Sequence, residues 1–368
     1  MVSIAFVVSS LGMGGIERVT TTIANNLALR GFDVTLVNLS HRKDFFPVRT
    51  QRYLRPGWFS YNWWRVRRKV SRLFCKNENR YTLEPWVCSL FKGGRYDYII
   101  LNPELFVFFD IVRRLHPESK VFLWMHNNYD IYINKYFKKQ HELLLHAVKE
   151  ADGIICLESY SAQRWKRWNE NVRLIYNPLT LIDRGHRSSL HIQTIAAASR
   201  LVKEHKGLDY LLAVAESLPD DWRISLAGDG DDRAWLQSEI VDRGLTDKLV
   251  LRGALDDESL DEHYANASIF LSTSRWEGFP LVAAEAMSRG LPFVSFDIPA
   301  MREVTKGGKY GFLVPLGDVK QMNKVLEELM ESDDLREEYS RLSLIRVKDF
   351  SLNKIIEKWI DFIEETDG

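Results

Sequence analysis

Short apolar runs alternate along the chain with segments whose apolar side chains recur at helical spacing, and this alternation occurs twice. In the first half, the pattern predicts strands at residues 2–9, 34–39, 98–101, 121–125 and 153–157 and helices at 15–30 and 140–150. After a polar stretch at 183–189, which we interpret as an interdomain linker, it predicts strands at 192–198, 224–227, 249–251, 269–272 and 293–296. The helices predicted in this second half are 208–217, 233–243, 260–265, 281–288, 322–331, 335–342 and 355–364.

Strands that alternate with helices are typical of α/β proteins with parallel, doubly wound sheets. We therefore expect two Rossmann-like domains that face each other across a cleft, at residues 1–180 and 181–350. We expect the C-terminal helix, at about residues 351–368, to pack back on the first domain. Ligands of such sheets bind at the carboxyl ends of the strands.

The composition indicates a folded, soluble chain. Hydrophobic residues make up 45% and charged residues 27% of the 368 positions, which excludes intrinsic disorder and fibrous repeats. The three cysteines, Cys75, Cys88 and Cys156, lack zinc-ligand spacing and are too few for a disulfide framework, so we expect a reducing, cytoplasmic compartment. The apolar stretches at 2–11 and 96–112 do not reach the ~20 residues that span a bilayer, and we expect neither a transmembrane helix nor an export signal.

Charge is balanced overall but concentrated in one segment. The 50 basic and 50 acidic residues cancel, yet residues 42–80 hold twelve basic residues against Asp44 and Glu78, interleaved with Trp and Tyr. Such a segment suits an anionic membrane surface. The alternatives are a solvated helix at 63–74 that packs its aromatics on the core, and nucleic-acid binding, which no recognition motif supports.

A glycine-rich loop follows the first predicted strand and opens a helix. Residues 12–18 read GMGGIER, and glycines here allow a tight turn and the close approach of a ligand to the helix N-terminus. A dinucleotide-binding loop would need a third glycine where Glu17 stands and an acid at the end of the second strand, which instead ends Val37-Asn38-Leu39. The loop is therefore either a ligand loop of another kind or a structural turn.

Two carboxylates flank a helix start in the second half. Residues 277–285 read EGFPLVAAE, follow a strand and open a helix, and Pro280 fits the first helical turn. Glu277 and Glu285 should lie on the order of 10 Å apart. The free N–H groups between them suit a phosphate, and the carboxylates can accept hydrogen bonds from sugar hydroxyls on either side of a diphosphate.

A basic loop follows another strand of the second half. In residues 199–207, SRLVKEHKG, Arg200 and Lys206 could converge on a diphosphate, and Lys203 is expected to be exposed. We assign His205, between them, to the loop, and no metal site is expected to assist. The D-x-D motif at Asp229 and Asp231 follows Ala227-Gly228 and is interpreted as a turn, so we expect a chelator to leave activity intact.

Together these motifs resemble the glycosyltransferase family 4 type, with the GT-B fold. The resemblance is carried by Gly14-Gly15-Ile16-Glu17, by Arg200 with Lys206, by residues 227–230 (AGDG) and by Glu277 with Glu285, and it covers the C-terminal half almost throughout. Ser199 departs from the glycine common in that family. The resemblance implies retaining transfer of a sugar from a nucleotide-sugar.

The resemblance also implies roles for individual residues. Arg200 and Lys206 would hold the diphosphate, Glu277 the sugar hydroxyls and Glu285 the ribose hydroxyls. Backbone N–H groups of Phe279 and Leu281 would approach the sugar and phosphate, and residues 252–255 would frame the base. His126 ends a strand of the first domain and would lie near the donor sugar. The expected nucleotide-sugar site comprises Gly14, Gly15, Arg200, Lys206, Gly228, Arg252, Gly253, Leu255, Glu277, Gly278, Phe279, Pro280, Leu281 and Glu285.

The resemblance thus implies a retaining hexosyltransferase, and we expect it to need no metal or other cofactor. We expect it to move a hexose or N-acetylhexosamine from a nucleotide-sugar, with UDP as the expected nucleotide, to a lipid-linked saccharide such as a lipopolysaccharide, O-antigen or capsule intermediate. The expected location is peripheral, on the inner face of the cytoplasmic membrane, through residues 42–80. The alternatives are a nucleotide-sugar 2-epimerase and a catalytically silent nucleotide-sugar-binding protein of the same fold.

Overall fold

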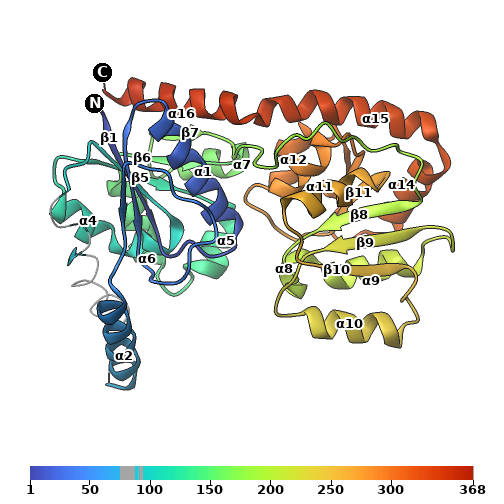
Figure 1. Cartoon of the computed structure of the whole chain (residues 1–368), viewed down its shortest axis with the longest axis horizontal. Helices are drawn as coiled ribbons and strands as arrows, with labels where there is room; N and C mark the ends of the chain where they lie inside the picture. Colours follow the sequence, from blue (N-terminus) through green and yellow to red (C-terminus); the bar gives the residue numbers. More distant parts are fainter. Residues whose placement is uncertain (75–87, 90, 92–93, 368) are drawn as a thin grey trace. The chain divides into compact units, whose positions relative to one another are not determined.

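The chain forms two compact units in a computed structural model that describes residues 1–74, 88–89, 91 and 94–367 (Figure 1). Unit 1 comprises residues 1–176 together with 355–368, and unit 2 comprises residues 177–354. The chain therefore leaves unit 1 once and returns to it at its end. Within the described part of the chain, no helix has both the length and the apolar character needed to cross a bilayer.

Unit 1 is built on a parallel sheet whose described strands follow the order β3-β2-β1-β4-β5-β6-β7. The strands are β1 (Ser3–Val8), β2 (Asp33–Asn38), β3 (Arg52–Leu54), β4 (Tyr98–Leu101), β5 (Lys120–Trp124), β6 (Gly153–Cys156) and β7 (Val172–Leu174). The central strands are buried along nearly their whole length, because helices cover both faces of such a sheet and their apolar runs need no alternation.

The helical elements of unit 1 connect these strands. They are α1 (Gly15–Leu29), α2 (Trp58–Phe74), η1 (Pro103–Phe108), α4 (Phe109–Leu115), α5 (Tyr129–Ile131), η2 (Tyr132–Tyr136), α6 (His141–Glu150), α7 (Ser159–Trp165) and most of α16 (Leu352–Asp367). The sequence pattern did not predict β3, β7 or the short helical turns. The two strands have only three residues each, and such short segments show too little periodicity to be recognised.

Helix α16 covers part of the unit 1 sheet. Its residues Ile355, Ile356, Trp359, Phe362 and Ile363 recur at helical spacing and are all buried. The Trp359 ring packs 5.6 Å from the ring of Phe6 in β1 and 4.9 Å from that of Trp124 in β5. The last segment of the chain is therefore part of the core of unit 1.

Unit 2 repeats the architecture with the strand order β10-β9-β8-β11-β12-β13. The strands are β8 (Thr194–Ala198), β9 (Arg223–Ala227), β10 (Leu249–Gly253), β11 (Ile269–Ser272), β12 (Phe293–Phe296) and β13 (Phe312–Val314). The helical elements are α8 (Lys203–Lys206), α9 (Leu208–Glu216), α10 (Arg233–Asp242), α11 (Asp257–Ala265), α12 (Leu281–Ser288), α13 (Pro299–Thr305), α14 (Val319–Glu331), α15 (Asp333–Arg346) and η3 (Val347–Phe350). Figure 1 shows α9 and α10 on one side of this sheet and α11 and α12 on the other.

The predicted linker at 183–189 is wrong, because these residues belong to the body of unit 2. His186 Nδ1 lies 2.6 Å from Asp261 Oδ2, and the backbone N–H of Ser188 donates to the carbonyl of Arg289 at 3.0 Å. Asp261 and Arg289 form a fully buried ion pair. The polar side chains that suggested a linker therefore satisfy hydrogen bonds within unit 2, and the units divide between residues 176 and 177.

Candidate active site

The sheet topology of unit 2 places the predicted motifs at one edge. Strand order reverses between β8 and β11, which pair in parallel with Ile269 opposite Ile195. The helices that follow these two strands run to opposite faces of the sheet, and this leaves a crevice at the carboxyl ends. The loop after β8 carries Arg200 and Lys206, and the loop after β11 carries Glu277.

Lys206 and Glu277 form the central contact of this crevice. Lys206 Nζ lies 2.5 Å from Glu277 Oε1, and the two side chains are 14% and 10% exposed. The hydroxyl of Ser274 donates to the same Glu277 oxygen at 2.7 Å. Residues from two loops, 71 positions apart in the sequence, are thus brought into one ion pair.

The electrostatic surroundings keep Glu277 ionised. Burial raises the pKa of its carboxyl, but the charge of Lys206, the nearby His205 and hydrogen bonds from Lys206 and Ser274 together hold this pKa below its ordinary value. At neutral pH, Glu277 is therefore a buried carboxylate that can accept hydrogen bonds from hydroxyl groups.

Arg200 lies at the start of the same basic loop. Its side chain is exposed, and its backbone carbonyl accepts a hydrogen bond from the N–H of Val202 at 2.9 Å. Burial lowers the pKa of the His205 ring, and the positive charges of Lys206 and Arg200 act in the same direction, against the Glu277 carboxylate and the Trp276 carbonyl, which raise it. Arg200 and Lys206 therefore add positive potential to the same small region.

Gly228 and Gly253 allow the backbones at the ends of β8, β9 and β10 to approach each other closely. Gly228 has φ of 135°, and a Cβ there would lie 1.8 Å from the Ser199 carbonyl oxygen. The N–H of Gly228 donates to the carbonyl of Gly253 at 2.7 Å. Arg252 is exposed beside this contact and Leu255 is half-buried. These residues lie at the same carboxyl edge as Arg200, because β8, β9 and β10 are successive parallel strands.

Glu285 lies inside helix α12, which begins at Leu281 with Pro280 as the preceding cap residue. The Glu285 side chain is buried, and the hydroxyl of Tyr264 donates to its Oε2 at 3.2 Å. Gly278 and Phe279, in the loop before the helix, are buried as well. Both glutamates of the motif are therefore held by specific donors rather than exposed to solvent.

The remaining predicted residues belong to unit 1. Helix α1 starts at Gly15, and Gly14 caps it with its carbonyl accepting from the N–H of Arg18 at 3.0 Å. This loop follows β1, at the reversal of strand order between β1 and β4. Gly14 has an extended backbone, so its φ alone does not require glycine.

His126 follows β5 and is buried. Its ring lies 4.4 Å from that of Trp124, and its backbone N–H donates to the Tyr132 hydroxyl at 2.8 Å. Burial lowers the pKa of the ring to about 3, so the ring is neutral. Within the described residues, its Nε2 atom has no hydrogen-bond partner.

The assignment of His205 to a simple loop is wrong. His205 lies in the helical turn α8, and its ring stacks on that of Trp276 with centroids 4.7 Å apart and planes 7° from parallel. A half-buried aromatic contact of this kind, between segments far apart in the sequence, leaves no periodic signal. The only available indication was the position of His205 directly before Lys206.

The D-x-D segment forms a turn. Asp229 Oδ1 accepts from the N–H of Gly230 at 2.8 Å, and the Asp229 carbonyl accepts from Leu201 at 2.9 Å. The described residues include no cluster of three or more His, Cys, Asp and Glu side chains that could hold a metal ion. The side chain of Asp229 thus helps to fold the loop after β9.

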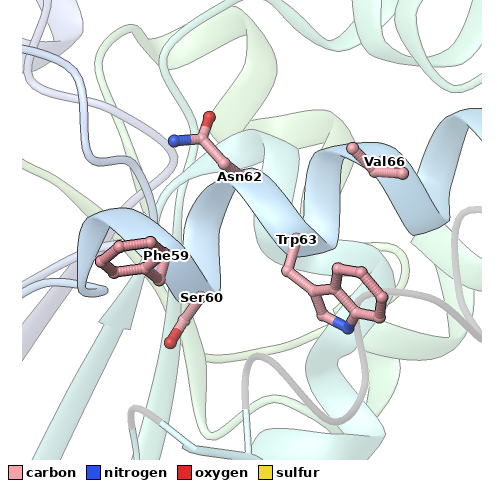
Figure 2. Close-up of a pocket in the computed structure, with 5 residues that line it drawn as sticks. All are labelled: Phe59, Ser60, Asn62, Trp63 and Val66. Carbon is pink, nitrogen blue, oxygen red and sulfur yellow. The ribbon is translucent and has the colours of Figure 1, made fainter.

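Helix α2 presents an apolar face to solvent. Phe59, Trp63 and Val66 are 82%, 67% and 54% exposed, and Figure 2 shows their side chains on successive turns with Ser60 and Asn62 between them. The packing of the aromatics of residues 63–74 on the core, one of the alternatives from the sequence, is therefore not found for Trp63. Residues 75–80 of the basic segment lie outside the described residues.

Comparisons with known proteins match a glycosyltransferase family model to each half of the chain. The model of the family described as Glycosyltransferase Family 4 matches residues 13–181, and that described as Glycosyl transferases group 1 matches residues 186–343. An uncharacterized glycosyltransferase of Haemophilus influenzae is 28% identical and covers 98% of this chain and 99% of its own.

One further relative and one solved structure of similar fold match nearly the whole chain. One is a Campylobacter jejuni protein, 22% identical over 99% of both chains, named as an alpha-1,4-N-acetyl-D-galactosaminyltransferase of a saccharide on PP-undecaprenol. The other is the solved structure of Anabaena HepE in complex with UDP and glucose, with a TM-score of 0.78 at 18% identity, covering 99% of this chain and 100% of that one.

Proposed function

Because this chain is a glycosyltransferase of the GT-B type, we propose that it transfers a hexose or N-acetylhexosamine from a UDP-sugar to a lipid-linked saccharide, with retention of anomeric configuration. The observation that carries this proposal is the buried Lys206–Glu277 pair at the strand-order reversal of unit 2. A half-buried cation beside a buried carboxylate offers one group for a diphosphate and one for sugar hydroxyls.

In this proposal, the donor binds along the carboxyl edge of the unit 2 sheet. Lys206 and Arg200 hold the diphosphate, Glu277 accepts from the sugar hydroxyls, and Glu285 accepts from the ribose hydroxyls. Support comes from the shared loop of Arg200 and Lys206 and from the ionised state of Glu277.

The backbone completes the proposed donor site. The N–H groups of Phe279 and Leu281 lie at the start of α12, where helix geometry favours an anion. Gly228 and residues 252–255 frame the base, which is consistent with the close contact between Gly228 and Gly253.

The chemical logic follows from the leaving group. Departure of the nucleoside diphosphate builds negative charge on its oxygens and positive charge on the anomeric carbon. Fixed positive charge from Lys206 and Arg200 stabilises this transition state more than the ground state, which is the requirement for rate acceleration. We propose that these side chains do so without a metal ion.

Retention follows from front-side attack in this proposal. An acceptor hydroxyl attacks the anomeric carbon from the face that the diphosphate leaves, and a diphosphate oxygen takes its proton. The bond from carbon to the diphosphate breaks as the glycosidic bond forms. NMR spectroscopy of the product anomer tests this point, and an inverted product contradicts it.

The lipid-linked acceptor is supported by two separate observations. The Campylobacter jejuni relative is named for an acceptor on PP-undecaprenol, and α2 exposes Phe59, Trp63 and Val66 within the basic segment at 42–80. An apolar helix face flanked by positive charge suits the interface of an anionic bilayer. We therefore propose peripheral binding to the inner face of the cytoplasmic membrane, where lipid-linked lipopolysaccharide, O-antigen or capsule intermediates would be the acceptors.

The donor assignment can be tested without knowing the acceptor. Incubation with UDP-, GDP- and dTDP-sugars should give slow hydrolysis of one UDP-sugar, the nucleotide that the HepE complex suggests. Conversion of the UDP-sugar to its 2-epimer would indicate the epimerase alternative, and binding without any turnover would indicate a silent binding protein.

Glu277→Ala tests the division of roles within the donor. Loss of the carboxylate should weaken binding of the UDP-sugar more than binding of UDP, since only the sugar would lose a partner. Isothermal titration of the wild type and the variant with both ligands measures the difference. Equal losses for UDP and UDP-sugar would contradict the assigned role of Glu277.

A further inference from the structure

His205 makes two contacts with the residue that precedes Glu277. Its ring stacks on the Trp276 ring, and its Nε2 lies 2.9 Å from the Trp276 carbonyl oxygen. Because a carbonyl oxygen only accepts hydrogen bonds, Nε2 must carry the proton. Burial, followed by the charge of Lys206, lowers the pKa of this ring to about 4, so the ring is neutral with its hydrogen on Nε2.

Further hydrogen bonds join the same two segments on either side of the Lys206–Glu277 pair. The N–H of Arg275 donates to the His205 carbonyl at 2.9 Å, and the Thr273 hydroxyl donates to the Lys206 carbonyl at 2.9 Å. The Arg275 guanidinium also binds both carboxylate oxygens of Asp209, at 2.8 and 2.6 Å. The backbone of residues 273–276 is therefore tied to that of residues 205–209.

We propose that His205 is a positioning residue, whose Nε2–H holds the Trp276 carbonyl and thereby sets the Glu277 carboxylate against Lys206 Nζ. The inference rests on the proposed function, because it assigns His205 a role through Glu277 rather than on the donor itself. The direct side-chain separation supports this indirect role, since His205 Nε2 is 3.9 Å from Glu277 Oε2 and 2.9 Å from the Trp276 carbonyl.

Two substitutions separate the hydrogen bond from the ring stack. His205→Phe keeps an aromatic ring on Trp276 but removes the donor. His205→Gln removes the ring but places an amide N–H close to the position of Nε2. His191→Phe is the matched control, because His191 is exposed in the same unit and lies outside the proposed site.

The first readout is hydrolysis of the UDP-sugar that the wild type turns over. His205→Phe should lower kcat by roughly 10- to 100-fold, because a misplaced reacting group is costly even for shifts of about 1 Å. His205→Gln should restore most of the rate, His191→Phe should match the wild type, and the affinity for UDP should be nearly unchanged in all three. A wild-type rate in His205→Phe, or a failure of Gln to improve on Phe, would overturn the proposal.

A double-mutant cycle tests whether His205 acts through Glu277. In the Glu277→Ala background, His205→Phe should have little further effect on turnover, because the group that it positions is gone. Full additivity of the two changes would show an independent role and contradict the inference. If turnover of the variants is too slow to measure, the same double-mutant cycle can be carried out with the ratio of UDP-sugar affinity to UDP affinity in place of the rate.

An NMR measurement tests the state of the His205 ring independently of the proposed function. Long-range ¹H–¹⁵N NMR spectra of the full chain should show His205 at pH 7 as the neutral tautomer with hydrogen on Nε2. Wild-type protein that binds none of the nucleotide-sugars would refute the proposed function but leave this anchoring intact. A charged ring, or hydrogen on Nδ1, would refute the anchoring itself.

Discussion

Gly207 and Thr273 approach so closely that a Cβ on Gly207 would lie 2.1 Å from the Thr273 carbonyl oxygen. Gly207 also has φ of 61°, a conformation in which side chains are strained. It directly follows Lys206, so this contact sets how near the basic loop comes to the loop that holds Glu277.

Gly207→Ala should therefore reduce both stability and turnover. Gly244 offers a matched control, because its φ is 67° but a Cβ there meets no atom within 4 Å. Gly244→Ala should lower the free energy of unfolding by about 1–2 kcal/mol from backbone strain alone. Gly207→Ala should lower it further and displace Lys206. Urea unfolding and donor hydrolysis measure both effects, and equal behaviour of the two variants would exclude a role for the Thr273 contact.

Lys206→Ala should cut turnover by about 10²–10³, the usual effect of losing one donor to a developing oxyanion. Lys203→Ala is the control on the same helical turn, since Lys203 is exposed and packs its ammonium 4.0 Å from the Trp235 ring centroid. Steady-state hydrolysis of the donor compares the two. A similar loss in both variants would mean that general positive charge, rather than the buried pair, matters.

Protonation of His263 should couple stability to pH. Burial, and to a lesser degree the charge of Arg252, lowers the pKa of this ring to about 4, although its bond to the Ala197 carbonyl opposes the shift. Because the ring is uncharged in the folded state and titrates near 6.5 when unfolded, its contribution is complete above pH 6.5 and is lost as pH falls toward 4.

The expected slope from His263 between pH 6 and pH 5 is about 1.4 kcal/mol per pH unit. Unfolding at pH 5.5 should therefore take up about one proton fewer in His263→Asn than in the wild type. Proton uptake on urea unfolding, measured with a pH indicator, tests this directly. Unchanged uptake would mean that the folded protein already binds that proton.

A chelator should leave the hydrolysis rate unchanged. Lys206 and Arg200 supply fixed positive charge in the proposed donor site, and the hydrogen bonds of Asp229 fold its own turn. Incubation with EDTA before the assay, with manganese added back, tests the expectation. Complete loss of activity that manganese alone restores would contradict it.

Replacement of the exposed face of α2 should release the protein from anionic vesicles. Phe59→Ser, Trp63→Ser and Val66→Ser together remove apolar area worth about 1.5–3 kcal/mol for each fully inserted side chain, so binding should fall more than about tenfold. The vesicles would contain phosphatidylglycerol, with phosphatidylcholine vesicles as the uncharged comparison. Sedimentation measures the bound fraction.

The matched control is the triple change Val241→Ser, Leu316→Ser and Ile345→Ser in unit 2, where the side chains are 57%, 51% and 53% exposed. This variant should bind vesicles as the wild type does. Charge reversal of Arg65, Arg67 and Arg68 should weaken binding further at low salt, because screening reduces such attraction. Equal sedimentation of all variants would remove the membrane proposal.

The fold could be predicted from the sequence because its signals are local. Continuous apolar strands and amphipathic helices repeat in order, and β2 (Asp33–Asn38) is shifted by only one residue from the predicted strand at 34–39. The same locality explains the errors. Residues 183–189 look like a linker because they are polar, but their partners Asp261 and Arg289 are distant in the sequence.

The sequence predicts which loops carry the candidate site residues, but it does not predict the contacts between those loops. Strand order places Arg200, Lys206 and Glu277 on neighbouring loops, and this follows from topology once the strands are known. The stack of His205 on Trp276 and the Tyr264 bond to Glu285 depend on how the loops fold against each other. Such contacts join residues with no shared periodicity, so no pattern in the sequence indicates them.

The return of α16 to unit 1 has a consequence for synthesis. Residues 177–354 emerge from the ribosome as a continuous stretch and can complete unit 2, while unit 1 still lacks the helix that carries Trp359 and Phe362. Until those final residues emerge, the aromatic side chains of Phe6, Phe122 and Trp124 lack their native cover. The strands of unit 1 are thus made before unit 2 but covered after it, and their apolar surface can aggregate in the interval.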